Sequence, residues 1–338
     1  MGFSRYRRLL RPGALVLLGC GLALVSTVGA ASAGEGHRVV HALGETHLEG
    51  RPERIVTLYQ GATDTALALG LEPVGVVESW LERPMYRYLR DELPAEVRFL
   101  GLETQPDLEA VAGLAPDLIV GARYRHAGVY PLLSRIAPTL IADSAHDFAA
   151  MLELMGQATG RESRARALLD AWHARVADFR CRAAAALGDA WPQSASVVSF
   201  RGDHARLYYD GFARSILDQL GLRRPEGQDG PGWGIKLVSR ESLPAMDADT
   251  IFVFMRDDPA VAELHRDWTA HPLWRNLAAV EQGRVYYVDP VIWNMGAGIQ
   301  AANRLLDELY AHYGLQNSGL QDYGLEDSSV PEGEGATC

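Results

Sequence analysis

The sequence predicts an α/β fold with two lobes of mainly parallel sheet, joined by a single long helix. Three observations lead to this prediction. Short apolar runs alternate with helix-like stretches from residue 54 onward, which is typical of β-α units around a parallel sheet. Residues 162–187 then keep helical periodicity without a breaker. The β-α alternation resumes at residue 195.

The first lobe is predicted over residues 37–147. Its strands are the short apolar runs at residues 54–59, 73–77, 98–101, 117–121 and 138–142. Its helices are the stretches between these runs, at residues 62–70, 107–114 and 128–136. A lobe of this length has the usual size of a domain.

A linking helical segment is predicted over residues 148–190. Its longest part, from Glu162, meets no breaker until Gly188. The apolar residues step by three or four positions and mark one helix face: Ala165, Leu168, Leu169, Trp172, Val176, Phe179 and Ala183. A helix from Glu162 to Leu187 would span roughly 39 Å. It is therefore long enough to cross from one lobe to the other.

The second lobe is predicted over residues 191–314. Its strands are expected at residues 195–200, 205–209, 250–255 and 284–289, and its helices at 212–220 and 298–313. The segment "GAGIQA" (296–301) matches the form G-x-G-x-x-A, but no β-α-β unit follows it. A tight helix start is therefore favoured over a dinucleotide site.

The two lobes contain one repeated layout. A Glu stands at the start of a short helix, an Asp follows eight residues later, and a buried strand comes next. Glu109 and Asp117 occupy these positions in the first lobe, and Glu241 and Asp249 occupy them in the second. The repeat indicates either two related lobes or a chance likeness between helix-to-strand units.

The two ends of the chain are predicted to lie outside both lobes. Residues 1–33 have a cationic start, an apolar core and the small-residue site "ASA", which predicts a secretory signal peptide cleaved after Ala33 and a periplasmic protein. A membrane anchor and a lipoprotein lipidated at Cys20 are the alternatives. Residues 315–338 are acidic without apolar periodicity and are predicted to form a disordered tail.

The charge of the chain argues against a nucleic-acid surface and favours a local anion site. Lys and Arg number 32 against 43 Asp and Glu, which gives a formal charge of -11. Within this acidic chain, "ARYRHAGVYPLL" (122–133) brings arginines, a histidine and tyrosines together. Such a cluster is expected to hold an anion.

Motif searches indicate neither a catalytic residue nor a resident cofactor. The forms G-x-S-x-G, H-E-x-x-H, C-x-x-C and G-x-x-x-x-G-K-[ST] do not occur. His37, His41 and His47 have irregular spacings and no predicted helix or hairpin around them, so they are expected to be surface histidines, not metal ligands. We therefore expect a protein that is not an enzyme and holds no metal or cofactor of its own.

Arginine and aromatic residues follow the predicted strand ends in both lobes. In parallel α/β sheets ligands bind at the carboxyl ends of strands, so these side chains are expected to face a cleft between the lobes. They are Tyr59, Trp80, Tyr124, Arg125, Arg201, Tyr209, Arg256 and Trp293. Arg125, Arg201 and Arg256 are predicted to clamp an anion, because guanidinium groups bind paired oxygens bidentately. Alternatively, Arg201 and Arg256 pair with nearby aspartates, and Trp293 belongs to the core.

The sequence resembles the periplasmic iron-chelate-binding proteins of ABC transporters over residues 50–313. The segment "LEAVAGLAPDLIV" carries the resemblance to the broad family, while "RHAGVY" and "HPLW" are similar to its ferric-citrate-type members. The resemblance implies two Rossmann-like lobes with the ligand between them. It also implies a monomer that captures a ferric siderophore or ferric citrate and delivers it to an inner-membrane ABC permease dimer.

The resemblance also implies roles for particular residues. Arg125 would contact the ligand, and Glu109 and Glu241 would dock on arginines of the permease. After Trp293 the sequence reads "NMGAG", without the positive charge expected for a citrate complex, so the chelate stays open. Cobalamin and haem binding in the same transporter class are alternatives, and so is an exported enzyme.

Overall fold

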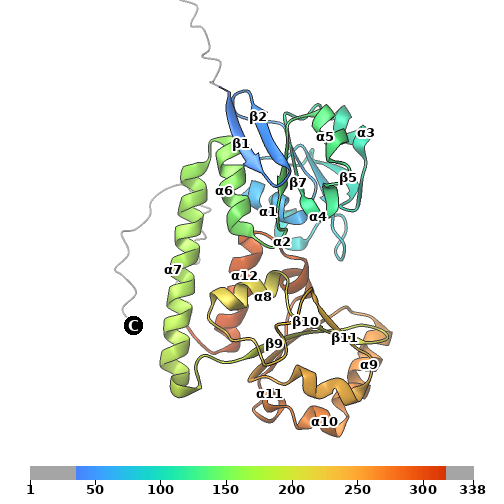
Figure 1. Cartoon of the computed structure of the whole chain (residues 1–338), viewed down its shortest axis with the longest axis vertical. Coiled ribbons are helices and arrows are strands. Elements are labelled where there is room, and N and C mark those ends of the chain that lie inside the picture. Colours follow the sequence, from blue (N-terminus) through green and yellow to red (C-terminus); the bar gives the residue numbers. More distant parts are fainter. Residues whose placement is uncertain (1–35, 317–338) are drawn as a thin grey trace, which may run out of the picture. The chain divides into compact units, whose positions relative to one another are not determined.

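The computed structural model describes residues 36–316 of the chain (Figure 1). The predicted signal peptide, the cleavage site after Ala33, Cys20 and residues 317–338 of the predicted tail lie outside the described residues. Within the described part, no helix has both the length and the apolar character needed to span a bilayer.

The first lobe is built on a six-stranded sheet with the order β6-β5-β4-β3-β7-β8. All neighbouring strands are parallel except β5 and β6. The strands are β3 (Ile55–Thr57), β4 (Gly75–Glu78), β5 (Arg98–Leu102), β6 (Gln105–Pro106), β7 (Leu118–Ala122) and β8 (Thr139–Ala142). Every residue of β3, β7 and β8 is buried, as expected for parallel strands covered on both faces.

Helices cover this sheet and carry the chain between its strands. They are α1 (Gln60–Ala68), α2 (Arg87–Arg90), α3 (Leu108–Gly113), α4 (Arg123–His126) and α5 (Tyr130–Ile136). All residues of α1 are buried. This helix therefore lies inside the molecule and contacts both α6 and α12.

The linking segment contains α6 (Phe148–Thr159), the long helix α7 (Glu162–Leu187) and the short 3-10 helix η1 (Gly188–Ala190). The apolar face predicted for α7 is buried. The Arg164 side chain of α7 donates to the carbonyl of Ala68 in the first lobe at 3.2 Å, and Trp172 donates to Gln219 of the second lobe at 2.9 Å. One helix therefore contacts both lobes, as predicted.

The second lobe is built on a five-stranded sheet with the order β11-β10-β9-β12-β13. Its strands are β9 (Ala195–Phe200), β10 (Ala205–Tyr208), β11 (Gly234–Leu237), β12 (Thr250–Met255) and β13 (Val285–Tyr287). Strands β9, β12 and β13 are parallel, but β10 and β11 are antiparallel, so this sheet is more mixed than predicted. The connection over residues 201–204 is too short for a parallel crossover.

The helices of the second lobe include short single turns that the sequence periodicity does not predict. The helices of this lobe, predicted and unpredicted together, are α8 (Phe212–Gln219), η2 (Arg240–Met246), α9 (Pro259–Thr269), α10 (Pro272–Arg275), α11 (Ala278–Glu281), the π-helix η3 (Val291–Met295) and α12 (Ile299–His312). Helix α12 begins within "GAGIQA", which confirms that this segment is a helix start.

A hairpin of β1 (His37–His41) and β2 (Gly44–Leu48) precedes the first sheet. It carries His37, His41 and His47, so the expectation that no hairpin surrounds these histidines is wrong. The described residues contain no group of three or more His, Cys, Asp or Glu placed to hold a metal.

The repeated Asp has the same structural role in both lobes. The Asp117 carboxylate accepts hydrogen bonds from the backbone N–H of Glu53 and Arg54 at 2.9 and 2.8 Å, directly before β3. The Asp249 carboxylate accepts one from Ser194 at 2.7 Å, directly before β9. Each carboxylate joins the starts of two neighbouring parallel strands, which supports two related lobes.

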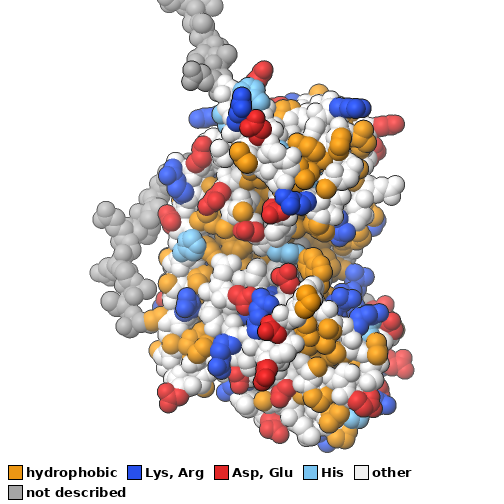
Figure 2. Space-filling model, viewed as in Figure 1, with side chains coloured by type: hydrophobic (Ala, Val, Ile, Leu, Met, Phe, Trp, Pro, Cys, Tyr) orange, Lys and Arg blue, Asp and Glu red, His pale blue; other side chains and the backbone are white. Residues whose placement is uncertain are grey.

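Charges of both signs are mixed over the surface. On the face drawn in Figure 2, Lys and Arg side chains stand among Asp and Glu instead of forming one basic patch. Exposed ion pairs such as Arg38–Glu45 and Arg240–Asp267, both at 3.0 Å, are of this kind. Such pairs contribute little to stability.

Candidate functional site

A cavity of about 370 Å³ lies between the two lobes. Its lining from the first lobe and the loop after β8 consists of Tyr59, Gln60, Trp80, Tyr86, Glu103, Tyr124, Arg125, Ala145 and His146. The second lobe contributes Trp233, Asn294, Met295, Gly296 and Ala297. The cavity therefore has aromatic walls and a small number of polar groups, as ligand sites usually do.

The strand order explains why the first-lobe groups meet here. Strands β3 and β7 are central neighbours although β4, β5 and β6 lie between them in sequence. The chain continues from β3 to β4 on one side and from β7 to β8 on the other, which opens a crevice at the carboxyl ends of β3 and β7. Tyr59 and Gln60 enter the crevice from β3, and Tyr124 and Arg125 enter it from β7.

Glu103 holds three of the predicted ligand contacts together. Its Oε1 atom accepts hydrogen bonds from the Tyr124 hydroxyl at 2.5 Å and from Arg125 Nε at 3.2 Å. Its Oε2 atom accepts from Trp80 Nε1 at 3.4 Å. Glu103 is only 5% exposed. A single buried carboxylate thus organises this wall of the cavity.

The backbone of Glu103 is fixed by a buried histidine. His126 Nδ1 accepts from the backbone N–H of Ala122 at 3.0 Å, so the hydrogen lies on Nε2, which donates to the Glu103 carbonyl at 3.1 Å. Burial lowers the pKa of His126, which favours this neutral form. The imidazole therefore ties the end of β7 to the segment after β5.

Arg125 is oriented by its Nε edge and by its flat face. Glu103 binds the Nε edge, while the guanidinium carbon lies 4.5 Å from the Tyr124 ring centre and 5.8 Å from that of Trp80. The Arg125 side chain is 35% exposed, and its two Nη groups form the edge that Glu103 does not bind. That edge has the geometry for a pair of carboxylate or chelate oxygens.

Further polar atoms of the lining have no hydrogen-bond partner among the described residues. They are Gln60 Oε1, the Tyr86 hydroxyl and both ring nitrogens of His146. Burial lowers the pKa of His146 and raises the pKa of Tyr86, so both side chains are neutral near pH 7. These groups can donate to or accept from a ligand, and the sequence pattern of arginine and aromatic residues at strand ends did not indicate them.

A smaller cavity of about 30 Å³ adjoins the first and shares His146, Trp233 and Asn294 with it. The second lobe supplies most of its lining, including Tyr208 and Trp293. Trp293 is buried and donates to Glu308 at 2.8 Å. Arg201 donates to the Tyr208 hydroxyl at 3.0 Å and lies outside the lining of both cavities.

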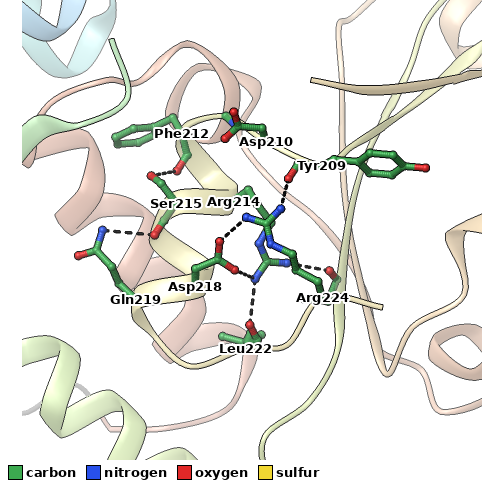
Figure 3. Close-up of polar contacts among 11 residues, drawn as sticks. Tyr209, Asp210, Phe212, Arg214, Ser215, Asp218, Gln219, Leu222 and Arg224 are labelled. Atoms are coloured by element: carbon green, nitrogen blue, oxygen red, sulfur yellow. Dashed lines mark hydrogen bonds and ion pairs between the residues drawn. The ribbon is translucent and has the colours of Figure 1, made fainter. Parts of the chain in front are cut away.

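Tyr209 packs into the core of the second lobe. Figure 3 shows its ring turned away from the network formed by Arg214, Asp218 and Arg224. Its carbonyl accepts from Arg224 at 2.5 Å, while Arg214 binds Asp218 at 2.7 Å. Because side chains alternate along a strand, Tyr208 faces the small cavity and Tyr209 does not.

The structure thus gathers some of the predicted ligand contacts and separates others. Tyr59, Trp80, Tyr124 and Arg125 line the main cavity. Arg201, Tyr209 and Trp293 lie behind it or beside it, and Arg256 is exposed outside its lining. A ligand role for these four residues stays a prediction, as does the arginine clamp.

A third cavity, of about 670 Å³, lies near α2, η3 and α12. Five of its nine lining residues are acidic: Asp91, Glu92, Asp289, Asp307 and Glu308. An ion pair between Arg87 and Asp289 crosses it from one lobe to the other. Its acidic lining suits an anionic ligand poorly, so the aromatic cavity is the better candidate.

The two predicted docking residues are exposed and lie in equivalent segments. Glu109 is in the first turn of α3, whose N-cap Asp107 accepts from the Glu109 backbone N–H at 3.1 Å. Glu241 is in η2, and hydrogen bonds from the Ser239 side chain and its own backbone lower its pKa. Both segments lead into a central strand, β7 or β12.

Comparisons with known proteins give a consistent result. The family model described as "Periplasmic binding protein" matches residues 55–292. The achromobactin-binding periplasmic protein of Dickeya dadantii is 44% identical over 261 residues, which cover 76% of this chain and 85% of that protein. The probable siderophore-binding lipoprotein YfiY of Bacillus subtilis is 37% identical, over 88% of this chain and 94% of that protein.

A solved structure is similar over the same region. Staphylococcus aureus SirA complexed with staphyloferrin B superposes with a TM-score of 0.79 at 40% identity. The superposition covers 83% of this chain and all of that one. This chain therefore shares its fold with a protein that was solved in complex with staphyloferrin B.

Proposed function

We propose that this chain, which belongs to the family of periplasmic binding proteins, captures a ferric siderophore or a related ferric chelate between its lobes. It then delivers the chelate to an ABC importer. The proposal is supported by relatives whose names state siderophore binding and by a solved structure that contains staphyloferrin B.

The observation that carries the proposal is the orientation of Arg125. Its Nε edge is bound by Glu103 and its face lies over Tyr124, so its Nη edge is ready for the oxygens of a ligand. A ferric chelate presents such oxygens around the metal, and its organic shell can pack against the aromatic walls. The preset geometry reduces the ordering entropy lost on binding.

The family consists of binding proteins, and we propose that this cleft releases its ligand unchanged. The support for capture comes from the family and from relatives named as binding proteins. The ion pair of Arg125 with Glu103 suits the positioning of a ligand, because Glu103 holds the guanidinium by its Nε edge.

Delivery requires export and a membrane partner. We propose a monomer that reaches the periplasm by cleavage after Ala33. Glu109 and Glu241, one in each lobe, would meet arginines on the two halves of a permease dimer. Exposed charges in such positions govern orientation and encounter rate more than affinity.

Titration of tryptophan fluorescence tests the proposed ligand class. Trp80 and Trp233 line the cleft, so an iron complex bound there should quench their emission. The titration uses ferric staphyloferrin B, ferric citrate, a ferric hydroxamate, a ferric catecholate, cobalamin and haem. Saturable quenching by a ferric chelate alone is expected. Binding of only cobalamin or haem, or of none of the six, would refute the proposed function.

A further inference from the structure

The main cleft is electrically balanced. Among its described lining residues, Arg125 and Glu103 are the only permanently charged side chains, and they are paired at 3.2 Å. His146 is neutral near pH 7, and so are the lining tyrosines Tyr59, Tyr86 and Tyr124, because burial lowers the pKa of the histidine and raises the pKa of each tyrosine. The adjoining small cavity is lined by Arg214, which is paired with Asp218 at 2.7 Å, and by Asp210. The exposed Arg256 lies outside the lining, but its charge acts on Tyr86 as that of Asp210 acts on His146, so these two opposite charges also offset each other. The cleft therefore offers little net positive charge to a ligand.

The burial of Glu103 makes its charge effective. The Glu103 side chain is 6% exposed and that of Arg125 is 35% exposed. A buried charge is screened less by water and salt than an exposed one. A ligand anion that binds the Nη edge of Arg125 therefore also feels repulsion from Glu103, and the chain as a whole carries a formal charge of -11.

We propose that Glu103 is a specificity-determining residue that restricts the cleft to ferric chelates of low net charge. The inference rests on the proposed function and adds the charge class of the ligand. A chelate with one oxygen pair toward Arg125 gains a bidentate contact. A polyanionic chelate gains the same contact but must also bring its remaining negative charges close to the Glu103 carboxylate. The resulting repulsion weakens binding of the polyanionic chelate relative to the chelate of low charge.

Glu103 has two roles that substitutions can separate. As a hydrogen-bond acceptor it positions Tyr124 and Arg125, and as an anion it balances the charge of Arg125. Glu103→Gln keeps one acceptor oxygen, which serves Tyr124 and Arg125, and removes the charge; only the longer 3.4 Å contact with Trp80 loses its acceptor. Glu103→Ala removes both roles. Asp143→Asn is the matched control, because Asp143 pairs with the exposed Arg123 at 3.0 Å and does not line the cleft.

The test compares three iron complexes of different charge. A ferric tris-hydroxamate is neutral, because three monoanionic groups balance the metal, and a ferric tris-catecholate is triply negative. Ferric staphyloferrin B is the third probe. Affinity for each is measured with wild type, Glu103→Gln, Glu103→Ala and Asp143→Asn, at low and at high salt.

Glu103→Gln should tighten binding of the most negative complex that the protein accepts by about tenfold at low salt, and clearly less at high salt. Binding of the neutral complex should change less than threefold, and Asp143→Asn should change neither. Glu103→Ala should gain less affinity for the anionic complex than Glu103→Gln, because it also loses the hydrogen bonds that position Tyr124 and Arg125. Equal effects of Glu103→Gln on neutral and anionic complexes, or a gain independent of salt, would overturn the inference.

The proposed function and this inference fail in different ways. If wild type binds no ferric chelate, the proposed function falls. If wild type binds one and Glu103→Gln leaves its affinity and salt dependence unchanged, the proposed function stands and only the charge selectivity is lost.

Discussion

The Asp64 carboxylate of α1 accepts a hydrogen bond from the backbone N–H of Gln300 in α12 at 3.0 Å, and a second one from Ala301 at 3.1 Å. Helix α12 starts after Gly298, which has no side chain to cap it, so Asp64 supplies the cap from another helix. Burial raises the pKa of Asp64 to about 7. This contact fixes the chain directly after the segment that lines the cleft.

Gly298 is required because the first turn of α12 lies against Asp64. A Cβ atom at residue 298 would stand 2.1 Å from Asp64 Cγ. Gly298→Ala should therefore destabilise the protein by about 1 to 3 kcal/mol. Gly113→Ala, near the end of α3 with no atom within 4 Å of the added methyl, should be neutral or slightly stabilising. Urea unfolding of both variants decides. Equal free energies of unfolding for the Gly298→Ala and Gly113→Ala variants would show that α1 and α12 are not packed this closely.

Arg125 and Arg123 form a natural pair of test and control. Both belong to α4, but Arg125 lines the cleft while Arg123 pairs with Asp143 outside it. Arg125→Ala should weaken binding of an anionic ferric chelate by one to two decades, since a charge-assisted contact contributes about 1.5 to 3 kcal/mol. Arg123→Ala should leave affinity unchanged in the same fluorescence titration. Similar affinities for both variants would remove Arg125 from the site.

Glu308 should make stability depend on pH. Burial, and then the charge of Asp289, raise the pKa of Glu308 to about 7 from its ordinary 4.5. A raised folded-state pKa gives stability that is complete below about pH 4.5 and is lost as pH rises through about 7. Glu308→Gln keeps an acceptor for Trp293 and removes the ionisation.

The Gln variant should therefore be more stable than wild type at pH 8, by about 1 to 2 kcal/mol after allowance for partial exposure. At pH 4.5 the two proteins should be equally stable. Urea midpoints at both pH values measure the difference in stability. The ionisation of Asp64 contributes equally to both proteins and does not affect this difference. A difference that is the same at pH 4.5 and 8 would contradict the assignment.

Glu109 and Glu241 can be removed without touching the cleft. The double substitution Glu109→Ala with Glu241→Ala should leave chelate affinity intact and abolish stimulation of the transporter ATPase in proteoliposomes. Glu45→Ala with Glu72→Ala removes two other exposed carboxylates of the first lobe and serves as the control. Normal transport by the Glu109 and Glu241 variant would limit both residues to a helix-terminus role.

The mature N-terminus is expected at Gly34. Intact mass of the protein from its native host should match a chain that begins there. A mass that begins at Cys20 with added acyl chains would establish the lipoprotein alternative.

The long, regular elements could be predicted from the sequence, while the edges of the sheets could not. Helix α7 was expected from Glu162 to Leu187 and begins and ends there, because its apolar stripe is long and a breaker follows it. Strand β11 escaped prediction because Ile235 and Lys236 are exposed on an edge strand, which leaves no apolar alternation to detect. The hairpin of β1 and β2 escaped for the same reason, since each strand has only one or two buried residues.

The rule that ligands bind at strand ends led to eight predicted ligand residues, and four of them line the cleft; that these four bind a ligand stays a prediction. Glu103 also follows a strand end, after β5, but a search for groups that bind an anion selects arginine and aromatic residues and passes over a carboxylate. Arg201 and Arg256 follow strand ends as well. They lie outside the cleft because the second lobe lines it with Trp233 and residues 294–297 instead.

The sequence by itself determined the order of the central strands and the longer helices, the long connection and the sheet edge where ligand groups gather, because each of these depends on local periodicity and on strand ends. Only the tertiary structure decided which side chains meet. Glu103 reaches Arg125 across 22 positions, and Asp64 caps Gln300 across 236. Such pairs depend on which strands become neighbours and on how closely two helices approach, and neither leaves a periodic signal in the chain.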